Sequence, residues 1–256
     1  MAIQGRNKIK EYRDNLSYKK YIEDTLKSDR KKFCPFRLER QMETLFKVIS
    51  PNLKQKNQRI LEVGCGYGRL IHFLNEYFPN QEYWGIDYIP KLISQAKANF
   101  NDRSNVHFEV LNAMNLSKKY HRHFDITILY KTLSWLPYYE RMIVEMAKAT
   151  RKKIFLTSLF YDGDIDFLTQ VIPQAGSTGN QGIFMNTYSL PKFTKFCKKV
   201  GINKVSSRDL HIDIDLKLSK DPNILQTHTL KAAKGPRLEV TGVVLLNWKL
   251  IELTVA

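Results

Sequence analysis

Three glycines and one aspartate have the residue types and spacing of a nucleoside-binding site. Gly64, Gly66 and Gly68 directly follow an apolar run at 59–63, and Asp87 comes at the end of the next apolar run. Glycines let a backbone turn tightly, and the N–H groups at the start of a following helix favour a polar or anionic ligand group. A carboxylate at the next strand end can accept hydrogen bonds from both hydroxyls of a ribose, each worth about 1.5–3 kcal/mol. The pattern therefore predicts a bound nucleoside.

Two details separate a dinucleotide from another nucleoside ligand. The dinucleotide fingerprint G-x-G-x-x-G requires a small residue at position 69, where this chain has Arg69. Glu62 stands two residues before the first glycine, so that positions 62–68 read EVGCGYG. This stretch closely resembles the E/D-x-G-x-G-x-G signature of the class I (Rossmann-like) S-adenosylmethionine-dependent methyltransferases. We therefore favour this family over the dinucleotide-binding proteins.

The resemblance implies that S-adenosylmethionine is the cofactor and S-adenosylhomocysteine the product. Gly64 and Gly66 would face its methionine part, and Asp87 its ribose hydroxyls. Asn112 stands where the family usually has an aspartate, and its amide can still accept a hydrogen bond from the adenine amino group. The expected cofactor-binding residues are Glu62, Gly64, Cys65, Gly66, Gly68, Asp87, Tyr88, Ile89, Asn112, Ala113, Met114 and Tyr130.

Candidates for the acceptor side lie in the later loops. Tyr139 lies after the apolar run at 124–129 and Tyr161 after the run at 153–159, but core packing or a turn explains them as well. His211 and Asp213 share one face of a strand-like run by period-two alternation, which is either a solvent-exposed face or a substrate site. The catalytic candidates are Tyr130, His211 and Asp213, and the substrate-binding candidates are Tyr139, Tyr161, His211 and Asp213.

These residues require a framework that brings strand ends together. The strand candidates are 59–63, 82–86, 106–110, 124–129 and 153–159, and the helix candidates between them are 68–77, 90–100 and 137–149. This alternation predicts an α/β fold with a doubly wound, mostly parallel sheet and helices on both faces. The carboxyl ends of parallel strands meet at one edge, where ligands of such sheets bind.

The two ends of the chain have a different character. A helix candidate at 190–200 precedes two strand-like runs, 204–216 and 238–253, that have no helix between them. Such strands pair antiparallel at a sheet edge, which predicts seven strands in all. Residues 1–50 read as a helical extension, either a lid over the cofactor or helices packed elsewhere, and residues 51–256 as the Rossmann-like domain.

The composition predicts a reduced, cytoplasmic protein. Hydrophobic residues make up 43% of the chain, which is enough for a sizeable core. No apolar run is long enough for a transmembrane helix, and we expect no signal peptide. The cysteines Cys34, Cys65 and Cys197 have no metal-ligand spacing, and we expect no metal site. The net charge of +16 is spread over short basic clusters, which favours a solvated surface over a polyanion-binding face.

The favoured function is methyl transfer to an oxygen or nitrogen of a small polar metabolite or surface-glycan precursor. The alternative is an RNA methyltransferase that uses the basic surface, although positions 129–132 read LYKT and not the Asn-Pro-Pro-Tyr or Asp-Pro-Pro-Tyr motif of base-modifying members. A non-catalytic, cofactor-binding subunit is disfavoured by the intact Glu62, Gly64, Gly66 and Asp87. Trp135 replaces a histidine that some family members use as a base, which puts a histidine-based mechanism there in doubt. The sequence predicts no particular oligomeric state.

Overall fold

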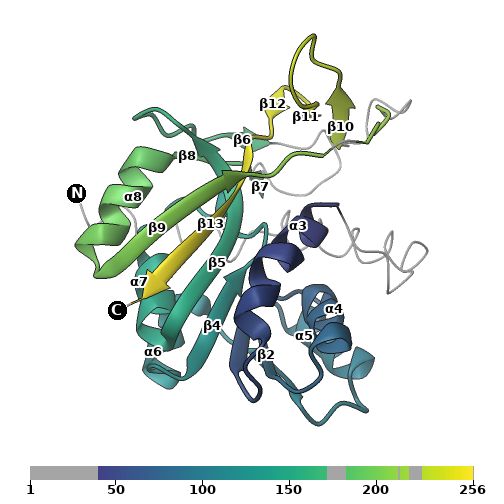
Figure 1. Cartoon of the computed structure of the whole chain (residues 1–256), viewed down its shortest axis with the longest axis vertical. Coiled ribbons are helices and arrows are strands. Elements are labelled where there is room, and N and C mark those ends of the chain that lie inside the picture. Colours follow the sequence, from purple (N-terminus) through teal and green to yellow (C-terminus); the bar gives the residue numbers. More distant parts are fainter. Residues whose placement is uncertain (1–39, 172–182, 213, 219–226, 256) are drawn as a thin grey trace.

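The fold is built around a central β-sheet (Figure 1). The structure is a computed structural model that describes residues 40–171, 183–212, 214–218 and 227–255. The strand order of the sheet is β3-β2-β1-β4-β5-β13-β9, and β8 also pairs with β5. Strands β1 to β5 and β8 run parallel, whereas β13 is antiparallel to both of its neighbours. The strands are β1 (Arg59–Val63), β2 (Glu82–Asp87), β3 (Val106–Val110), β4 (Phe124–Leu129), β5 (Thr150–Tyr161), β8 (Thr187–Ser189), β9 (Ile202–Asp209) and β13 (Trp248–Val255).

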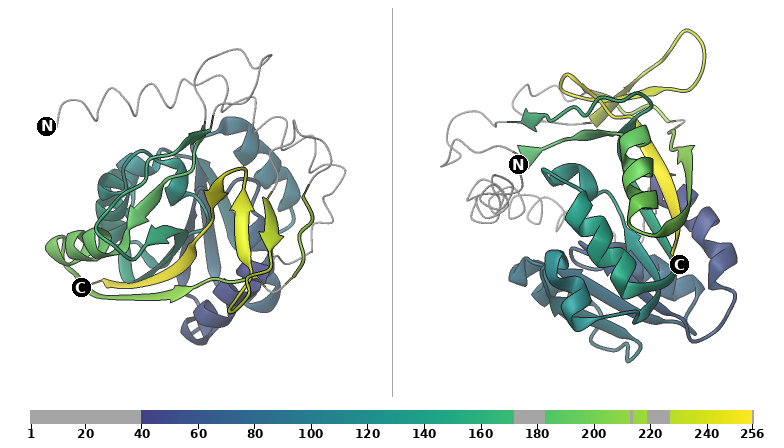
Figure 2. Two further views of the ribbon diagram at one scale, coloured as in Figure 1. Left: turned by 90° about the horizontal axis from the view of Figure 1, so that it is seen from above. Right: turned by 90° about the vertical axis from the view of Figure 1, so that its left-hand side faces the viewer.

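Helices cover both faces of this sheet, and each face has its own hydrophobic cluster. Figure 2 shows α3 and α7 on opposite sides of the sheet. Strand β4 is buried at all six positions because both of its faces are covered. On one face lie α3 (Arg40–Ile49), α4 (Arg69–Tyr77) and α5 (Pro90–Asn99), and on the other α6 (Leu116–Lys119), α7 (Glu140–Ala149) and α8 (Leu190–Lys199).

This architecture confirms the predicted doubly wound sheet and its antiparallel final strands. Of the predicted N-terminal extension, residues 40–49 form α3, and the residues before them lie outside the described part of the chain. Short 3-10 helices follow α3 and two of the strands: η1 (Ser50–Leu53), η2 (Ala113–Asn115) and η3 (Leu133–Trp135).

The end of the chain differs from the prediction in three ways. The run 238–253 is not one strand, because Gly242 turns the backbone with φ +58° and the chain breaks into three strands. The strand predicted at 204–216 ends at Asp209, and with β13 it forms the predicted antiparallel pair at one edge of the sheet, with β9 outermost. The remaining strands form two small sheets, of β10 (Thr227–Leu230), β11 (Leu238–Thr241) and β12 (Val244–Leu245), and of β6 (Gln170–Val171) and β7 (Ile183–Phe184).

The described helices are short. The longest have ten residues, and none of those in the described ranges is long and apolar enough to span a membrane.

Candidate active site

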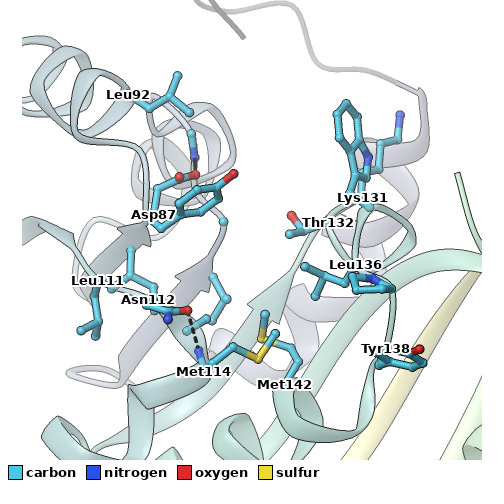
Figure 3. Close-up of a pocket in the computed structure, with 18 residues that line it drawn as sticks. Asp87, Leu92, Leu111, Asn112, Met114, Lys131, Thr132, Leu136, Tyr138 and Met142 are labelled. Atoms are coloured by element: carbon cyan, nitrogen blue, oxygen red, sulfur yellow. Dashed lines mark hydrogen bonds between the residues drawn. The ribbon is translucent and has the colours of Figure 1, made fainter. Parts of the chain in front are cut away.

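A largely apolar cavity of about 210 Å³ opens at the carboxyl ends of β1, β2 and β4 (Figure 3). It lies where the strand order reverses between β1 and β4, which is the position where doubly wound sheets bind ligands. Seven of the predicted cofactor-binding residues line it: Gly64, Gly66, Asp87, Tyr88, Asn112, Ala113 and Met114. The structure thus brings together residues that lie up to fifty positions apart in the sequence.

The glycine turn forms one wall of the cavity, and its glycines have different reasons to lack a side chain. All three have positive φ, at +69° for Gly64, +55° for Gly66 and +88° for Gly68. A Cβ at Gly64 would lie 2.7 Å from Oγ1 of Thr132, whereas a Cβ at Gly66 would meet no protein atom within 4 Å. Because Gly66 lines the cavity, a side chain there would enter ligand space. The absence of a side chain at Gly66 therefore leaves the backbone open to the cavity.

Gly68 and Cys65, the other predicted residues of this turn, pack against the protein core. A Cβ at Gly68 would lie 2.7 Å from Cζ of Phe108, so this glycine packs the start of α4 against β3. Cys65 is buried, and burial raises the pKa of its thiol. Neither residue lines the cavity, so both have a packing role at the turn.

Asp87 is the buried carboxylate of the cavity, and the backbone fixes its orientation. Its Oδ2 accepts a hydrogen bond from the N–H of Gly66 at 3.1 Å, and its Oδ1 accepts one from the N–H of Ile89 at 3.0 Å. Burial raises the pKa of Asp87, and these N–H donors oppose the shift because they stabilise the charged form. Ile89 therefore contributes through its backbone. Each carboxylate oxygen keeps a further lone pair for a ligand donor.

Glu62 is a residue of β1, just before the glycine turn. It is 4% exposed, does not line the cavity, and its Oε2 has no hydrogen-bond partner among the described residues. Burial raises the pKa of this carboxyl well above its ordinary value, and the nearby Asp87 raises it further. The surroundings of Glu62 thus disfavour its charged form.

Replacing Glu62 with glutamine should flatten the pH dependence of stability. Because folding raises its pKa, the folded protein holds a proton that the unfolded chain loses between the ordinary glutamate pKa and the raised value. The free energy of unfolding therefore falls as the pH rises through this window, by up to about 1.4 kcal/mol per pH unit. Urea denaturation at several pH values measures this slope. Equal slopes for the wild type and the variant would contradict the assignment.

Asn112 presents an amide to the cavity. Its Oδ1 accepts a hydrogen bond from the N–H of Met114 at 3.1 Å and so caps η2. Its Nδ2 is buried without a partner among the described residues. Because an unsatisfied buried donor is costly, this N–H is best explained by a ligand acceptor. The Asn112 oxygen, which was expected to accept from the adenine amino group, already has a backbone partner.

The segment after β4 forms the opposite wall, and none of its lining residues was among the predicted site residues. Lys131, Thr132, Trp135, Leu136, Tyr138 and Met142 line the cavity here. The available signal was position alone, since this segment directly follows a fully buried parallel strand. Tyr130 instead packs against the core cluster on the α3 face and does not line the cavity.

The central part of the chain is similar to known proteins. Residues 61–153 match the family model described as a methyltransferase domain. The chain is 27% identical over 191 residues to malonyl-[acyl-carrier protein] O-methyltransferase 1 of Ilyobacter polytropus, across 71% of this chain and 63% of that protein. A second enzyme of this name, from Anoxybacillus flavithermus, is 29% identical over 96 residues, 38% of this chain and 36% of that protein. The chain therefore spans less than two thirds of these relatives.

Solved structures share the fold. The 1,6-didemethyltoxoflavin-N1-methyltransferase of Burkholderia thailandensis has a TM-score of 0.59 and 12% identity, over 92% of this chain and 87% of that one. YcgJ from Bacillus subtilis has a TM-score of 0.54 and 13% identity, over 84% and 97%. The family model also includes the glycine turn and Asp87. Residues 61–153 therefore match a methyltransferase domain, and the chain has the fold of these methyltransferases.

The cavity fits S-adenosylmethionine, the cofactor that the sequence signature predicts. Asp87 presents a fixed carboxylate suited to ribose hydroxyls, and the buried Nδ2 of Asn112 suits a ring nitrogen of adenine. The open space beside Gly66 leaves room for a ligand against the backbone. These three features support cofactor binding independently of the sequence signature.

Two of the predicted acceptor residues, Tyr139 and Tyr161, lie outside the cavity. Tyr139 is buried and packs edge-to-face against Tyr188 and Phe193, with ring centroids 5.1 Å apart in each pair. Tyr161 is 41% exposed and packs against Phe167. The core-packing explanation therefore holds for Tyr139, and Tyr161 is a surface residue in this structure.

His211, the described candidate on the 204–216 run, does not line the cavity either. The side chain of His211 is 49% exposed, and its Nε2 lies 4.0 Å from Oδ2 of Asp209. Asp209 in turn forms an ion pair with the buried Lys249. Asp213 lies outside the described residues. Strand β9 ends before His211, so the alternation that placed both side chains on one strand face does not apply.

Proposed function

We propose that this chain transfers the methyl group of S-adenosylmethionine to an oxygen or nitrogen of a small polar acceptor, such as a metabolite or a surface-glycan precursor. The observation that carries the proposal is Asp87, a buried carboxylate whose two oxygens are aligned by the N–H groups of Gly66 and Ile89. Such an arrangement costs solvation energy and is suited to a ligand with paired hydroxyl donors.

When bound, the cofactor supplies an electrophilic methyl group on a sulfonium, whose departure needs no protonation. The chain's own residues then have to orient both reactants and exclude water. In this proposal Asp87 and Asn112 hold the nucleoside, and the apolar side chains of Leu92, Leu111 and Met142 disfavour water in the cavity. Alignment is thus the main contribution that this cavity can make.

The lining of the cavity favours an acceptor atom that has already lost its proton. The described lining residues include no histidine, and both oxygens of Asp87, their one carboxylate, accept backbone N–H bonds. A carboxylate oxygen needs no general base at neutral pH. The names of the two relatives, both O-methyltransferases of a malonyl group, support an oxygen acceptor of this kind.

Transfer of a labelled methyl group tests the proposal. The purified chain is incubated with S-adenosylmethionine carrying a radioactive methyl group and with a cell extract separated into a small-molecule fraction and an RNA fraction. We expect label in the small-molecule fraction, and Asp87→Ala as the control should reduce it about 100-fold, given the strength of hydrogen bonds to charged groups. Label in RNA alone would overturn the proposal in favour of the RNA alternative, as would the steep salt dependence that phosphate contacts cause.

A further inference from the structure

The wall of the cavity at 135–138 extends from the protein interior to solvent. All four of its residues line the cavity, and Tyr138 is 40% exposed, the most exposed of the described lining residues. Figure 3 shows Leu136 and Tyr138 across the cavity from Asp87. An acceptor that enters from solvent therefore passes along the 135–138 wall, on the side away from the proposed nucleoside position.

The backbone of the 135–138 wall has little regular structure of its own. The three-residue helix η3 ends within it, and the N–H of Leu136 donates to the carbonyl of Leu133 at 3.0 Å. Leu136 itself is extended, with φ −97° and ψ 143°. Pro137 follows it and has no N–H with which to continue the turn. The carbonyl groups at this point are fixed by another part of the chain.

The segment at β8 makes these contacts, although it lies about fifty residues later in the sequence. The N–H of Asn186 donates to the carbonyl of Ser134 at 2.8 Å, and its Nδ2 donates to the carbonyl of Leu136 at 2.8 Å. The hydroxyl of Tyr188 also donates to the carbonyl of Leu136, and it lies 3.4 Å from the carbonyl of Leu133. Two side chains thus hold the same carbonyl group of the wall.

Asn186 is itself held in one orientation. It is 0% exposed, and its Oδ1 accepts a hydrogen bond from the N–H of Thr169 at 3.0 Å. The next residue, Thr187, exchanges backbone hydrogen bonds with Phe167 at 2.8 and 2.9 Å. Both the oxygen and the nitrogen of the Asn186 amide are therefore used, and a satisfied buried network of this kind rigidifies the residues that it joins.

We propose that Asn186 and Tyr188 are positioning residues for the methyl acceptor. By holding the carbonyl of Leu136, they place the side chains of Leu136 and Tyr138 where the acceptor meets the methyl donor. Neither Asn186 nor Tyr188 lines the cavity, so both act through the wall. The inference rests on the proposed function, because only a methyl acceptor would use this side of the cavity. Supporting hydrogen bonds hold site residues to within about 0.5 Å of their productive geometry.

A pair of substitutions tests the shared carbonyl. Asn186→Ala removes the amide, and Tyr188→Phe removes the hydroxyl and keeps the ring. Each single variant leaves the Leu136 carbonyl one of its two side-chain partners. The amount of acceptor needed for half the maximal rate should therefore rise about threefold in each single variant and about 30-fold in the double variant, more than the product of the two.

Labelled methyl transfer measures this saturation. The probe is the small-molecule fraction of a cell extract, added in increasing amounts to the chain with radioactive S-adenosylmethionine. Calorimetric titration with S-adenosylhomocysteine measures the cofactor side separately. Its affinity should stay at the wild-type value in all three variants, because Asp87 and Asn112 belong to the other wall.

Hydrogen exchange read by mass spectrometry gives a result that needs no acceptor. The N–H groups of Trp135 and Leu136 both donate within the turn at η3, so they exchange faster when this turn opens. The double variant should speed exchange in the segment 131–138 and leave β1 and β2 as in the wild type.

A second pair of residues supplies a matched control. The Nδ2 of Asn105 donates to the carbonyl of Gln81 at 2.8 Å, and the hydroxyl of the buried Tyr83 donates to the carbonyl of Leu74 at 2.9 Å. Both residues lie near the amino ends of their strands, away from the cavity. Asn105→Ala with Tyr83→Phe should lower the unfolding temperature as well, but should leave exchange at 131–138 and acceptor saturation unchanged.

The inference is overturned if the folded double variant saturates with acceptor like the wild type, or if the control pair impairs saturation equally. If the double variant does not fold, the single variants decide, and wild-type saturation in both would overturn the inference. A wild type that neither binds S-adenosylhomocysteine nor labels the small-molecule fraction would instead refute the proposed function, before any variant is tested.

Discussion

Replacing Asp87 with alanine should lower the affinity for S-adenosylhomocysteine by about 100-fold or more. In the proposed role of Asp87 the variant loses a hydrogen bond from each ribose hydroxyl, and a hydrogen bond to a charged group contributes about 1.5–3 kcal/mol. It also releases the N–H groups of Gly66 and Ile89, which Asp87 now holds. Isothermal titration calorimetry measures the affinity.

A matched control and an intermediate variant accompany Asp87→Ala. Asp102 is exposed in the turn after α5, and Asp102→Ala should leave the affinity unchanged. Asp87→Asn keeps one acceptor oxygen and should fall between the wild type and Asp87→Ala. Thermal unfolding without ligand shows whether each variant is folded. A folded Asp87→Ala protein with wild-type affinity would refute the role of this carboxylate.

Gly66→Ala should weaken S-adenosylhomocysteine at least about tenfold while the protein stays folded. The new methyl group meets no protein atom within 4 Å, so it projects into the cavity and into ligand space. The left-handed φ of +55° adds a backbone cost of about 1–2 kcal/mol, which lowers the unfolding temperature by several degrees. Calorimetry and thermal unfolding measure the two effects separately.

Gly201 offers a control for this backbone strain. It has a φ of +86°, its added Cβ would also meet nothing within 4 Å, and it follows α8, away from the cavity. Gly201→Ala should therefore lose a similar amount of stability and keep its full affinity. If the two variants lost the same affinity, strain and not ligand contact would explain the effect of Gly66→Ala.

The parallel half of the fold could be predicted from the sequence because local and tertiary preferences agree there. The strands at 59–63, 106–110 and 124–129 have the predicted bounds, since each is a short apolar run between turn residues. Strand β5 extends beyond its apolar run to Thr150 and Tyr161, because pairing with neighbouring strands holds its polar ends in the sheet. Strand bounds set by partners cannot be read from one segment alone.

The donor side of the site was more predictable than the acceptor side for a physical reason. The proposed cofactor site is built from a glycine turn and a strand-end aspartate, which are local features with a fixed spacing. The acceptor side depends on how later loops fold back on the sheet, and such contacts leave no periodic signal. Tyr139 was therefore assigned to the substrate although it fills the core, and Lys131 was overlooked although it lines the cavity.

The central claim is that the cavity beside the glycine turn binds S-adenosylmethionine and its product. Titration of the wild-type protein with S-adenosylhomocysteine, with NAD in a parallel titration, tests it most directly. We expect saturable binding of one S-adenosylhomocysteine per chain, with a dissociation constant on the order of micromolar, and no saturable binding of NAD. No binding of S-adenosylhomocysteine at millimolar concentration, or equally tight binding of NAD, would contradict the account.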